Sequence, residues 1–458
     1  MGAEMCLEIW VVMLSLCVNI LLSCVGAYIS YRIILEYIPI FIKRQMYGKD
    51  QCKIDNIPVP EPIGVISAAV YLIVMFLFIP FPVYEWSQFE SSIPHQKFLM
   101  FLSALTAICS AVLLGFADDV LDLRWRHKLL FPTLSSLPLL LVYYVSGKLF
   151  LCHLFGTVGS SATIVLPSLI RALFPVQECI NIGIFYYVYM GMMIVFCTNA
   201  INILAGINGL EAGQAFIIAS SVVIFNAVEL FRLDPSVSWC HSLSLYFLLP
   251  FLGTTSVLLY FNWYPAQVFV GDTFCYWAGM TLASACILGH FSKTMALFLI
   301  PQASFCLSCS KFFPLYFSIY FDFCLIKLIS IFNFIYSIPQ LLHLVPCPRH
   351  RLPKYNSKTN TVDMSTIEFK ENDLKPLTKV VLDFLDIFGL LYKKIIEKND
   401  VRWAVINNLT LLNLVLKFTG PMHEKKLTEI LLTLQVLFSV LAFFIRFYVA
   451  YLMYEVVL

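Results

Sequence analysis

The sequence contains few charged residues. Asp, Glu, Lys and Arg make up 13% of its 458 residues, whereas 60% are hydrophobic and 15% are aromatic. The mean hydropathy is +0.83. Soluble domains carry about 25% charged residues. The composition therefore excludes an ordinary soluble protein and predicts an integral membrane protein.

Other common features are also missing. The net charge is only +2, too small to attract nucleic acid through bulk charge, so we expect no nucleic-acid partner. The 15 cysteines form no His and Cys cluster with zinc spacing, and we treat them as small hydrophobic residues. Glu4 and Glu8 precede the first apolar run, whereas a secretory signal begins with basic residues. We expect this run to remain as a membrane span.

Long apolar runs are abundant, and ten are long enough to cross a bilayer. They begin near Ile9, Ile63, Phe98, Leu129, Asn181, Ala212, Ser242, Thr273 and Thr294, and the last covers residues 427–452. The first and third loops hold eight Lys and Arg, against three in the second and fourth. The positive-inside rule therefore places the first and third loops in the cytosol. It also places there the polar loop 347–426 between the last two spans, in which we expect helix around residues 379–394.

Polar residues gather at the predicted cytosolic ends of three spans. "GFADDVLDLRWRHK" (115–128) carries three carboxylates and ends on Lys128. "CTNAINILAGINGLEAGQ" (197–214) is rich in Asn, and "NWYPAQVFVGDTF" (262–274) contains Asp272. Crowded carboxylates repel one another unless a cation is present. Lys128 or a divalent ion could be that cation, and Mg²⁺ is typically held by one or two carboxylates together with substrate phosphates.

The triplet Arg349, His350 and Arg351 begins the long loop. After a span, such a triplet is more often a positive-inside anchor than a binding site. Two guanidiniums and an imidazole can also bind phosphate oxygens through charge-assisted hydrogen bonds. Together with carboxylates on the same side of the membrane, the triplet indicates phosphoryl transfer, in which positioning and charge neutralisation provide most of the catalysis.

These motifs resemble those of the polyprenyl-phosphate N-acetylhexosamine-1-phosphate transferase family, and its eukaryotic branch in particular. The resemblance rests on "FADDVLDLRWRHK", "CTNAINILAGINGLEAGQ", "VFVGDTFCYWAGM" and "CPRHR", in this order along nearly the whole chain. It implies ten transmembrane helices in the endoplasmic reticulum membrane, a cytosol-facing active-site cleft, Mg²⁺ dependence and a homodimer. The expected fold is an all-α polytopic membrane protein, with residues 1–458 as a single membrane catalytic domain.

The resemblance also implies roles for individual residues. The catalytic residues would be Asp118, Asp119 and Lys128. The lipid phosphate would be bound by Lys128 and Asn199, and the metal by Asn202 and Asp272. The nucleotide sugar would contact Lys49, Asp50, Gln51, Glu61, Asn208, Phe269, Arg349, His350 and Arg351, with Phe269 stacking on the base.

The implied reaction joins a lipid to a nucleotide sugar. A phosphate oxygen of dolichyl phosphate attacks the β-phosphorus of UDP-N-acetylglucosamine, and UMP leaves. The product, N-acetylglucosaminyl-diphosphodolichol, stays among the membrane lipids and starts the oligosaccharide used for protein N-glycosylation. Two alternatives remain. A transporter would also have many spans, but its polar residues would lie near the midplane. A bacterial-type relative would use undecaprenyl phosphate or a muramyl substrate.

Residues 303–330 form a 28-residue insertion, "ASFCLSCSKFFPLYFSIYFDFCLIKLIS", that does not match the family pattern. A single extra crossing would carry Arg351 to the opposite side of the membrane from Asp118, and two crossings need more residues. The insertion must therefore be re-entrant, lie on the membrane surface, or be absent from the working protein as an unspliced segment. We favour the last interpretation.

Overall fold

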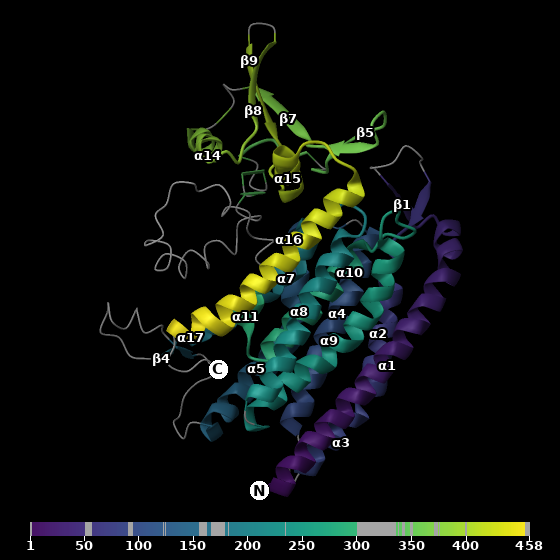
Figure 1. Cartoon of the computed structure of the whole chain (residues 1–458), viewed down its shortest axis with the longest axis vertical. Helices are drawn as coiled ribbons and strands as arrows, with labels where there is room; N and C mark the ends of the chain where they lie inside the picture. Colours follow the sequence, from purple (N-terminus) through teal and green to yellow (C-terminus); the bar gives the residue numbers. More distant parts are fainter. Residues whose placement is uncertain are drawn as a thin grey trace.

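The computed structural model shows a mostly helical chain with a small lobe at one end of a helical bundle (Figure 1). It describes residues 2–50, 57–89, 95–121, 123, 125–154, 163–165, 179–181, 183–233, 235–299, 336–337, 339–340, 344–348, 351–370, 374, 376–398 and 401–453. The insertion 303–330 and the predicted site residues Gln51, Arg349 and His350 lie outside these ranges.

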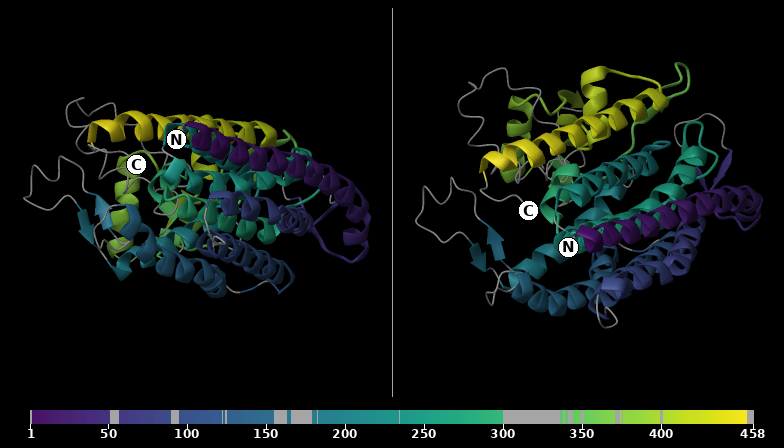
Figure 2. Two further views of the ribbon diagram at one scale, coloured as in Figure 1. Left: turned by 90° about the horizontal axis from the view of Figure 1, so that it is seen from below. Right: turned by 60° about the horizontal axis from the view of Figure 1, so that its bottom comes forward.

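Seven helical segments of the described chain are long and apolar enough to cross a membrane. They are α1 (Gly2–Lys43), α2 with α3 (Gly64–Phe78 and Pro80–Phe89), α4 (His95–Leu121), α7 (Ile184–Ile203), α8 (Leu210–Arg232), α9 (Pro235–Asn262) and α16 (Glu424–Phe444). A π-helical turn, Ile445–Val449, and α17 (Ala450–Met453) continue α16, which runs along one side of the bundle (Figure 2). The chain is a polytopic membrane protein.

Three more helices lie where the sequence predicts spans. The helices α5 (Trp125–Leu154) and α10 (Gly271–Leu288) match the runs that begin near Leu129 and Thr273, and α11 (Ser292–Phe298) matches the start of the run near Thr294. The described part of α11 has seven residues, too few to cross a bilayer. The total of ten spans stays a prediction.

The helix α10 forms the centre of the bundle, where it packs against α4, α7 and α9. Every residue from Thr273 to Leu288 is buried. Two glycines allow α4 and α7 to approach α10 closely, because any side chain at these two positions would collide with the backbone of the facing helix. A Cβ at Gly115 would lie 2.8 Å from the Cα of Thr273, and one at Gly279 would lie 2.3 Å from the Cα of Thr198. These contacts bring the carboxyl ends of α4 and α7 to the start of α10.

Two short antiparallel strand pairs accompany the bundle. The pair β1 (Tyr47–Lys49) and β2 (Pro58–Pro60) lies at the lobe end, and β3 (Thr163–Val165) pairs with β4 (Cys179–Asn181). The backbone N–H of Phe269 donates to Pro60 O at 2.9 Å, and the N–H of Ile63 donates to Phe269 O at 3.1 Å. The loop before α10 is thus attached to the β1–β2 hairpin.

The lobe comprises residues 351–419 and contains both strands and helices. Its elements are β5 (Lys354–Asn356), β6 (Thr361–Asp363), β7 (Thr366–Lys370), α14 (Pro376–Ile387), β8 (Lys393–Lys398), β9 (Val401–Asn407) and α15 (Leu411–Thr419). The antiparallel sheet has the order β7-β9-β8, and β5 pairs with β6. Leu382 and Ile406 belong to a second hydrophobic core, which extends into the bundle through Leu204 and Ile207.

The lobe corrects two predictions made from the sequence. The all-α class holds for the bundle but is wrong for the lobe, where strands of three to seven residues are stabilised by pairing with distant segments. Helix does not continue to residue 394, because α14 ends at Ile387 and Gly389 adopts a φ of 67°. A left-handed glycine ends a helix readily, and β8 begins four residues later, at Lys393.

Candidate functional site

The structure brings Asp119 to the amino end of α10. Its carboxylate accepts hydrogen bonds from the backbone N–H groups of Asp272 at 2.7 Å and Thr273 at 2.8 Å, and from the Thr273 hydroxyl. An acidic group is favourable there because it satisfies unpaired N–H groups and the positive end of the helix dipole. Both oxygens of Asp119 are therefore used to hold the first turn of α10, and with it Asp272.

Gly271 provides the turn into α10. Its φ is +75°, and a Cβ at this position would lie 2.2 Å from the Cβ of Pro62 and 2.9 Å from an oxygen of Asp119. A residue with a side chain would be strained by the positive φ and would also collide with both neighbours. This glycine therefore contributes to the placement of the Asp272 carboxylate.

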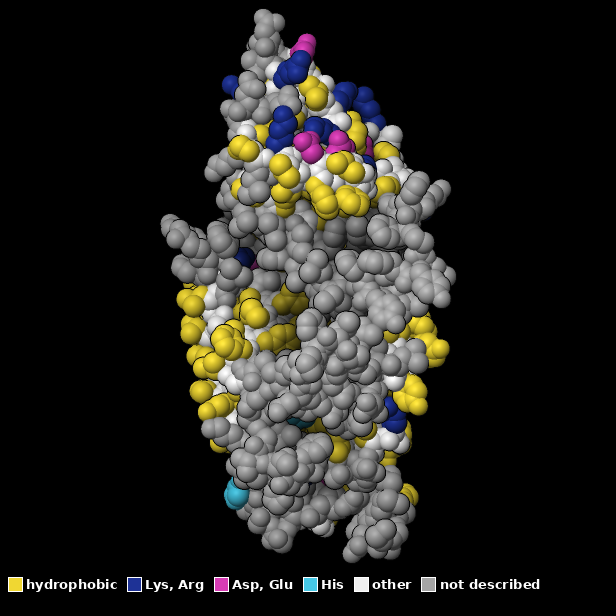
Figure 3. Space-filling view, turned by 90° about the vertical axis from the view of Figure 1, so that its left-hand side faces the viewer, with side chains coloured by type: hydrophobic (Ala, Val, Ile, Leu, Met, Phe, Trp, Pro, Cys, Tyr) yellow, Lys and Arg dark blue, Asp and Glu magenta, His cyan; other side chains and the backbone are white. Residues whose placement is uncertain are grey.

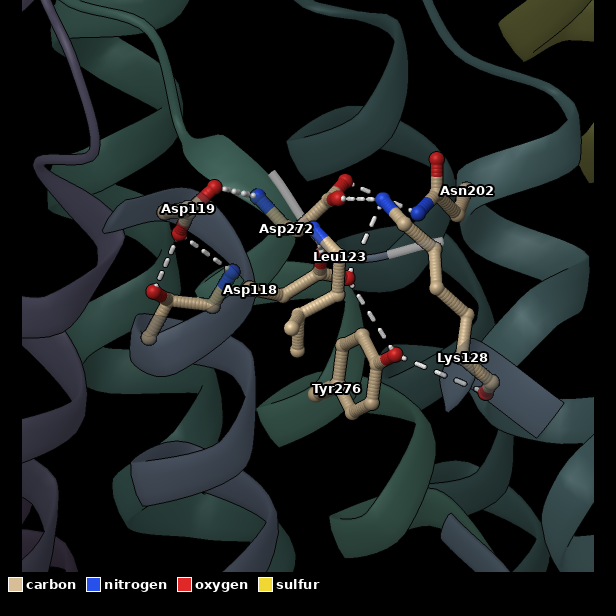
Figure 4. Close-up of polar contacts among 8 residues, drawn as sticks. Asp118, Asp119, Leu123, Lys128, Asn202, Asp272 and Tyr276 are labelled. Atoms are coloured by element: carbon tan, nitrogen blue, oxygen red, sulfur yellow. Dashed lines mark hydrogen bonds and ion pairs between the residues drawn. The ribbon is translucent and has the colours of Figure 1, made fainter. Parts of the chain in front are cut away.

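Lys128 joins two carboxylates from different helices (Figure 4). Its ammonium nitrogen lies 3.0 Å from Asp118 Oδ2 and 2.5 Å from Asp272 Oδ2. Burial lowers the pKa of Lys128, but the two carboxylates outweigh it and keep the pKa above its usual value. The second oxygen of Asp272 accepts from the Asn202 amide at 2.8 Å, and the Tyr276 hydroxyl donates to Asp118 at 3.3 Å.

We call Asp118, Asp119 and Asp272, together with Lys128, the acidic cluster. It fits the requirements of Mg²⁺. Two carboxylates share one lysine, so the cluster retains excess negative charge, and Asp118 is only 2% exposed. The available donors are carboxylate and amide oxygens, which magnesium prefers, and substrate phosphates commonly complete its coordination. Within the described part of the chain, no group of three or more His, Cys, Asp or Glu is arranged to hold a metal ion by itself, so the metal would depend on substrate oxygens as further ligands. Asp272 and Asn202 remain the predicted ligands.

A second group of predicted residues meets at the β1–β2 hairpin. We call these residues, Asp50, Glu61, Asn208 and Phe269, the hairpin group. Asn208 donates from its amide nitrogen to the buried Asp50 carboxylate at 3.0 Å. A Cβ at Gly48 would lie 2.5 Å from Glu61 Oε2 and 3.0 Å from the Phe269 ring, so this glycine lies against both side chains. Burial raises the pKa of Glu61, and the charge of Asp272 raises it further.

The structure also places three further residues that were predicted to belong to the site. Lys49 is exposed on β1. Asn199 lies on α7 three residues before Asn202, but its amide nitrogen donates to Val195 O at 2.8 Å within its own helix. Arg351 lies at the start of the lobe, where its carbonyl oxygen accepts from the Asn413 side chain at 2.9 Å.

The start of the lobe, at Arg351 and Leu352, contacts the turn that leads to Asn208 of the hairpin group. A Cβ at Gly206 would lie 2.0 Å from Leu352 Cδ2, so the residue after Arg351 packs directly on the turn that leads to Asn208. The Nη1 atom of Arg351 is buried and has no hydrogen-bond partner in the described chain. Burial lowers the pKa of Arg351. A buried, unsatisfied guanidinium N–H is costly, and an anionic ligand would provide the missing acceptor.

Sequence reasoning missed the residues that hold Asn208. Glu424 Oε1 accepts from the Asn208 backbone N–H at 2.8 Å, and the Thr428 hydroxyl donates to the Asn208 carbonyl at 3.0 Å. Both come from α16, more than 200 positions away, and no local pattern marks them. Tyr276 was also missed, although its spacing of four from Asp272 places both on one helix face.

Comparison with known proteins shows the family to which this chain belongs. The Glycosyl transferase family 4 model matches residues 101–290, the range that contains the whole acidic cluster. The UDP-N-acetylglucosamine–dolichyl-phosphate N-acetylglucosaminephosphotransferase of Schizosaccharomyces pombe is 39% identical and aligns over 97% of each chain. The proteins of that name in Saccharomyces cerevisiae and Dictyostelium discoideum are 40% and 35% identical, over 88% and 92% of this chain and 84% and 86% of their own lengths. The chain therefore belongs to the UDP-N-acetylglucosamine–dolichyl-phosphate N-acetylglucosaminephosphotransferase family.

Proposed function

We propose that this protein transfers N-acetylglucosamine 1-phosphate from UDP-N-acetylglucosamine to dolichyl phosphate. A phosphate oxygen of the lipid forms a bond to the β-phosphorus, the bond from that phosphorus to the UMP oxygen breaks, and UMP leaves. The supporting observation is the shared ion pair of Lys128 with Asp118 and Asp272 at the lobe end of a membrane-spanning bundle. There, a lipid phosphate and a water-soluble nucleotide sugar can meet.

The residues of the acidic cluster have distinct proposed roles. The nucleophile is a phosphate, whose second pKa is about 6 in phosphorylated side chains, so it needs little help from a general base near neutral pH. Asp119, whose oxygens hold the start of α10, acts by positioning Asp272. Lys128 provides a positive charge for the attacking lipid phosphate. Asn199 lies one turn from Asn202, and we propose it as a second contact to that phosphate.

Magnesium would be held by Asp272 and Asn202, with substrate oxygens as further ligands. When bound, it supplies positive charge that neutralises the pyrophosphate. The protein's contribution is the orientation of these two side chains by Asp119, Gly271 and the hydrogen bond between Asn202 and Asp272.

The nucleotide sugar would be bound by the hairpin group and the start of the lobe. Asn208 and Phe269 would contact the uridine, with Phe269 stacking on the base and Asp50 fixing the Asn208 amide. Arg351 would donate to the pyrophosphate or the sugar, for which its buried, unsatisfied Nη1 is the support. Glu61 and Lys49 line the same hairpin as further contacts.

Family membership supports the cellular setting that we propose. The protein would lie in the endoplasmic reticulum membrane as a homodimer, with ten spans and its active-site cleft facing the cytosol. Residues 1–458 would form one membrane catalytic domain, with 347–426 on the cytosolic side. A transporter is disfavoured because the polar cluster lies at one end of the bundle rather than at its middle.

The direct test is UMP release by the purified protein. We expect release from UDP-N-acetylglucosamine only when both dolichyl phosphate and Mg²⁺ are present. Matched reactions with undecaprenyl phosphate, or with a UDP-linked muramyl donor, should be slower. Faster turnover of either alternative substrate would instead favour a bacterial-type activity, and no release with any pair would contradict the assignment.

A further inference from the structure

The lobe carries an exposed apolar helix face that its own core does not cover. Val380, Phe384 and Ile387 of α14 follow the i, i+4 and i+7 spacing of one helix face, and Phe388, directly after the helix, continues it at i+8 through a hydrogen bond from its N–H to Phe384 O. They are 66%, 57%, 82% and 50% exposed. The rings of Phe384 and Phe388 lie with their centroids 4.6 Å apart. We call these four residues the α14 apolar face. A contiguous exposed apolar surface of this kind marks an interaction site.

The rest of the helix explains why this face remains open. Thr378, Leu382 and Leu385 are buried, and the two leucines pack in the second hydrophobic core. The buried side of α14 thus already supplies the contacts that fold the lobe. Because a lobe helix needs only one apolar stripe for its own core, the second stripe points to an additional apolar environment.

The α14 apolar face is tethered close to the membrane. The Lys417 ammonium of α15 donates to the carbonyl of Gly389, and the Tyr336 hydroxyl donates to the carbonyl of Leu390 at 2.9 Å. These bonds fix the chain just after α14. The helix α15 ends at Thr419, and the membrane-crossing α16 begins at Glu424. Consequently α14 cannot move far from the bilayer that α16 crosses.

The polarity of the lobe changes with distance from the bundle. Figure 3 shows hydrophobic side chains gathered on the lower part of the lobe, nearest the bundle, and Lys and Arg above them. Residues 351–419 contain eleven Lys and Arg against eight Asp and Glu. Apolar side chains on the part of the lobe nearest the bundle, together with a basic excess, suit a bilayer leaflet that contains anionic lipid.

We propose that the α14 apolar face docks into the headgroup region of the leaflet at the lobe end of the bundle. Phe384, Ile387 and Phe388 enter the boundary between headgroups and acyl chains, and the lysines of the lobe attract anionic lipid phosphates. This contact holds the lobe, including Arg351 at its start, at a fixed height over the acidic cluster. The docking stands independently of the proposed reaction, because it concerns only the lobe and the lipid.

The test is photolabelling of the full-length protein in nanodiscs. The probe is a phospholipid with a photoreactive group on its acyl chain near the headgroup, in phosphatidylcholine with or without phosphatidylserine. Peptides that cover residues 376–398 are then measured by mass spectrometry. We expect label on the peptide containing Phe384 and Ile387, with more label when phosphatidylserine is present. Phe384→Asp/Ile387→Asp should reduce this label several-fold.

Matched controls separate docking from misfolding. Ser357→Asp/Thr359→Asp adds the same two charges to the exposed β5–β6 turn and should leave the label unchanged. Label on the membrane-crossing α16 peptides should be equal in all variants if they fold. An unlabelled α14 peptide in the wild-type protein would overturn the proposal. So would crosslinking of this face to a second copy of the chain, or to another protein, in place of lipid.

Discussion

Glu424 Oε1, in the first turn of α16, accepts a hydrogen bond from the backbone N–H of Asn208 at 2.8 Å. Asn208 in turn donates from its side chain to Asp50 at 3.0 Å. The hydrogen bonds therefore connect the helix that follows the lobe, the turn after α7 and the β1–β2 hairpin. The proposed uridine end of the site depends on segments that are distant in the sequence.

Removal of this acceptor should weaken nucleotide-sugar binding. Glu424→Ala leaves the buried N–H of Asn208 without its partner, which typically costs about 1–3 kcal/mol. We expect the KM for UDP-N-acetylglucosamine to rise roughly tenfold, since about 1.4 kcal/mol corresponds to a factor of ten. The KM for dolichyl phosphate should change little. Glu424→Gln keeps an acceptor oxygen and should recover most of the affinity. Equal KM values for wild type and Glu424→Ala would refute the role.

A methyl group at Gly48 should disturb the proposed uridine site. The added Cβ would approach Glu61 Oε2 to 2.5 Å and the Phe269 ring to 3.0 Å, so both side chains must move. We expect Gly48→Ala to weaken UDP binding, measured by calorimetry, by about 1–3 kcal/mol, the usual cost of overpacking. Gly191→Ala is the matched control, because its Cβ would meet only Leu140 Cδ1, at 3.6 Å. If both variants bound UDP like the wild type, the hairpin would not form the site.

Loss of the shared lysine should stop turnover. Lys128→Met leaves Asp118 and Asp272 without the ammonium that lies between them. We expect kcat to fall by about 10²–10³, the range for removal of one electrostatic contact at a reacting group. Binding of UDP-N-acetylglucosamine in Mg²⁺ should persist, because Asn208, Phe269 and Arg351 are untouched. A variant with normal kcat and normal KM for dolichyl phosphate would show that Lys128 only balances charge.

Deletion of residues 303–330 tests whether the insertion belongs to the working protein. We expect the shortened protein to retain or improve activity and thermal stability, because the segment supplies no residue proposed for the chemistry. Peptide mapping of the native protein provides the complementary measurement. If the active native protein contained peptides from this segment and lost activity on its deletion, the unspliced-segment interpretation would be wrong.

The meeting of Asp118, Lys128 and Asp272 in space could be predicted from the sequence, because they are polar residues at the ends of apolar runs. Such positions are conspicuous in a chain with 13% charged residues, and α-helical geometry brings the ends of adjacent spans together. The family resemblance implied roles for Asn208 and Phe269, which stay predictions, and the structure places both residues against the β1–β2 hairpin. The resemblance did not show that Asp119 caps α10, because that contact depends on the close approach of α4 and α10 at Gly115.

The lobe was less predictable for a physical reason. Its strands are short, and β7 is stabilised by pairing with β9 more than 30 residues further along the chain. Local propensity carries little information about such pairs. Likewise, Glu424 lies within a charged stretch that is typical of a solvated helix start, and only the tertiary contact with Asn208 reveals its role.

The measurement that tests the central claim most directly is the Mg²⁺ dependence of UMP release by the wild-type protein and by Asp272→Asn. The amide keeps the size of the carboxylate but removes the charge proposed to hold the metal. Asp383→Asn, in the lobe, removes a charge that pairs with Lys393 and serves as the control. We expect Mg²⁺-dependent release from the wild type and the control, and a loss of about 10²–10³ in Asp272→Asn that added Mg²⁺ does not restore. Release by Asp272→Asn at the wild-type rate, with the same Mg²⁺ dependence, would contradict the account.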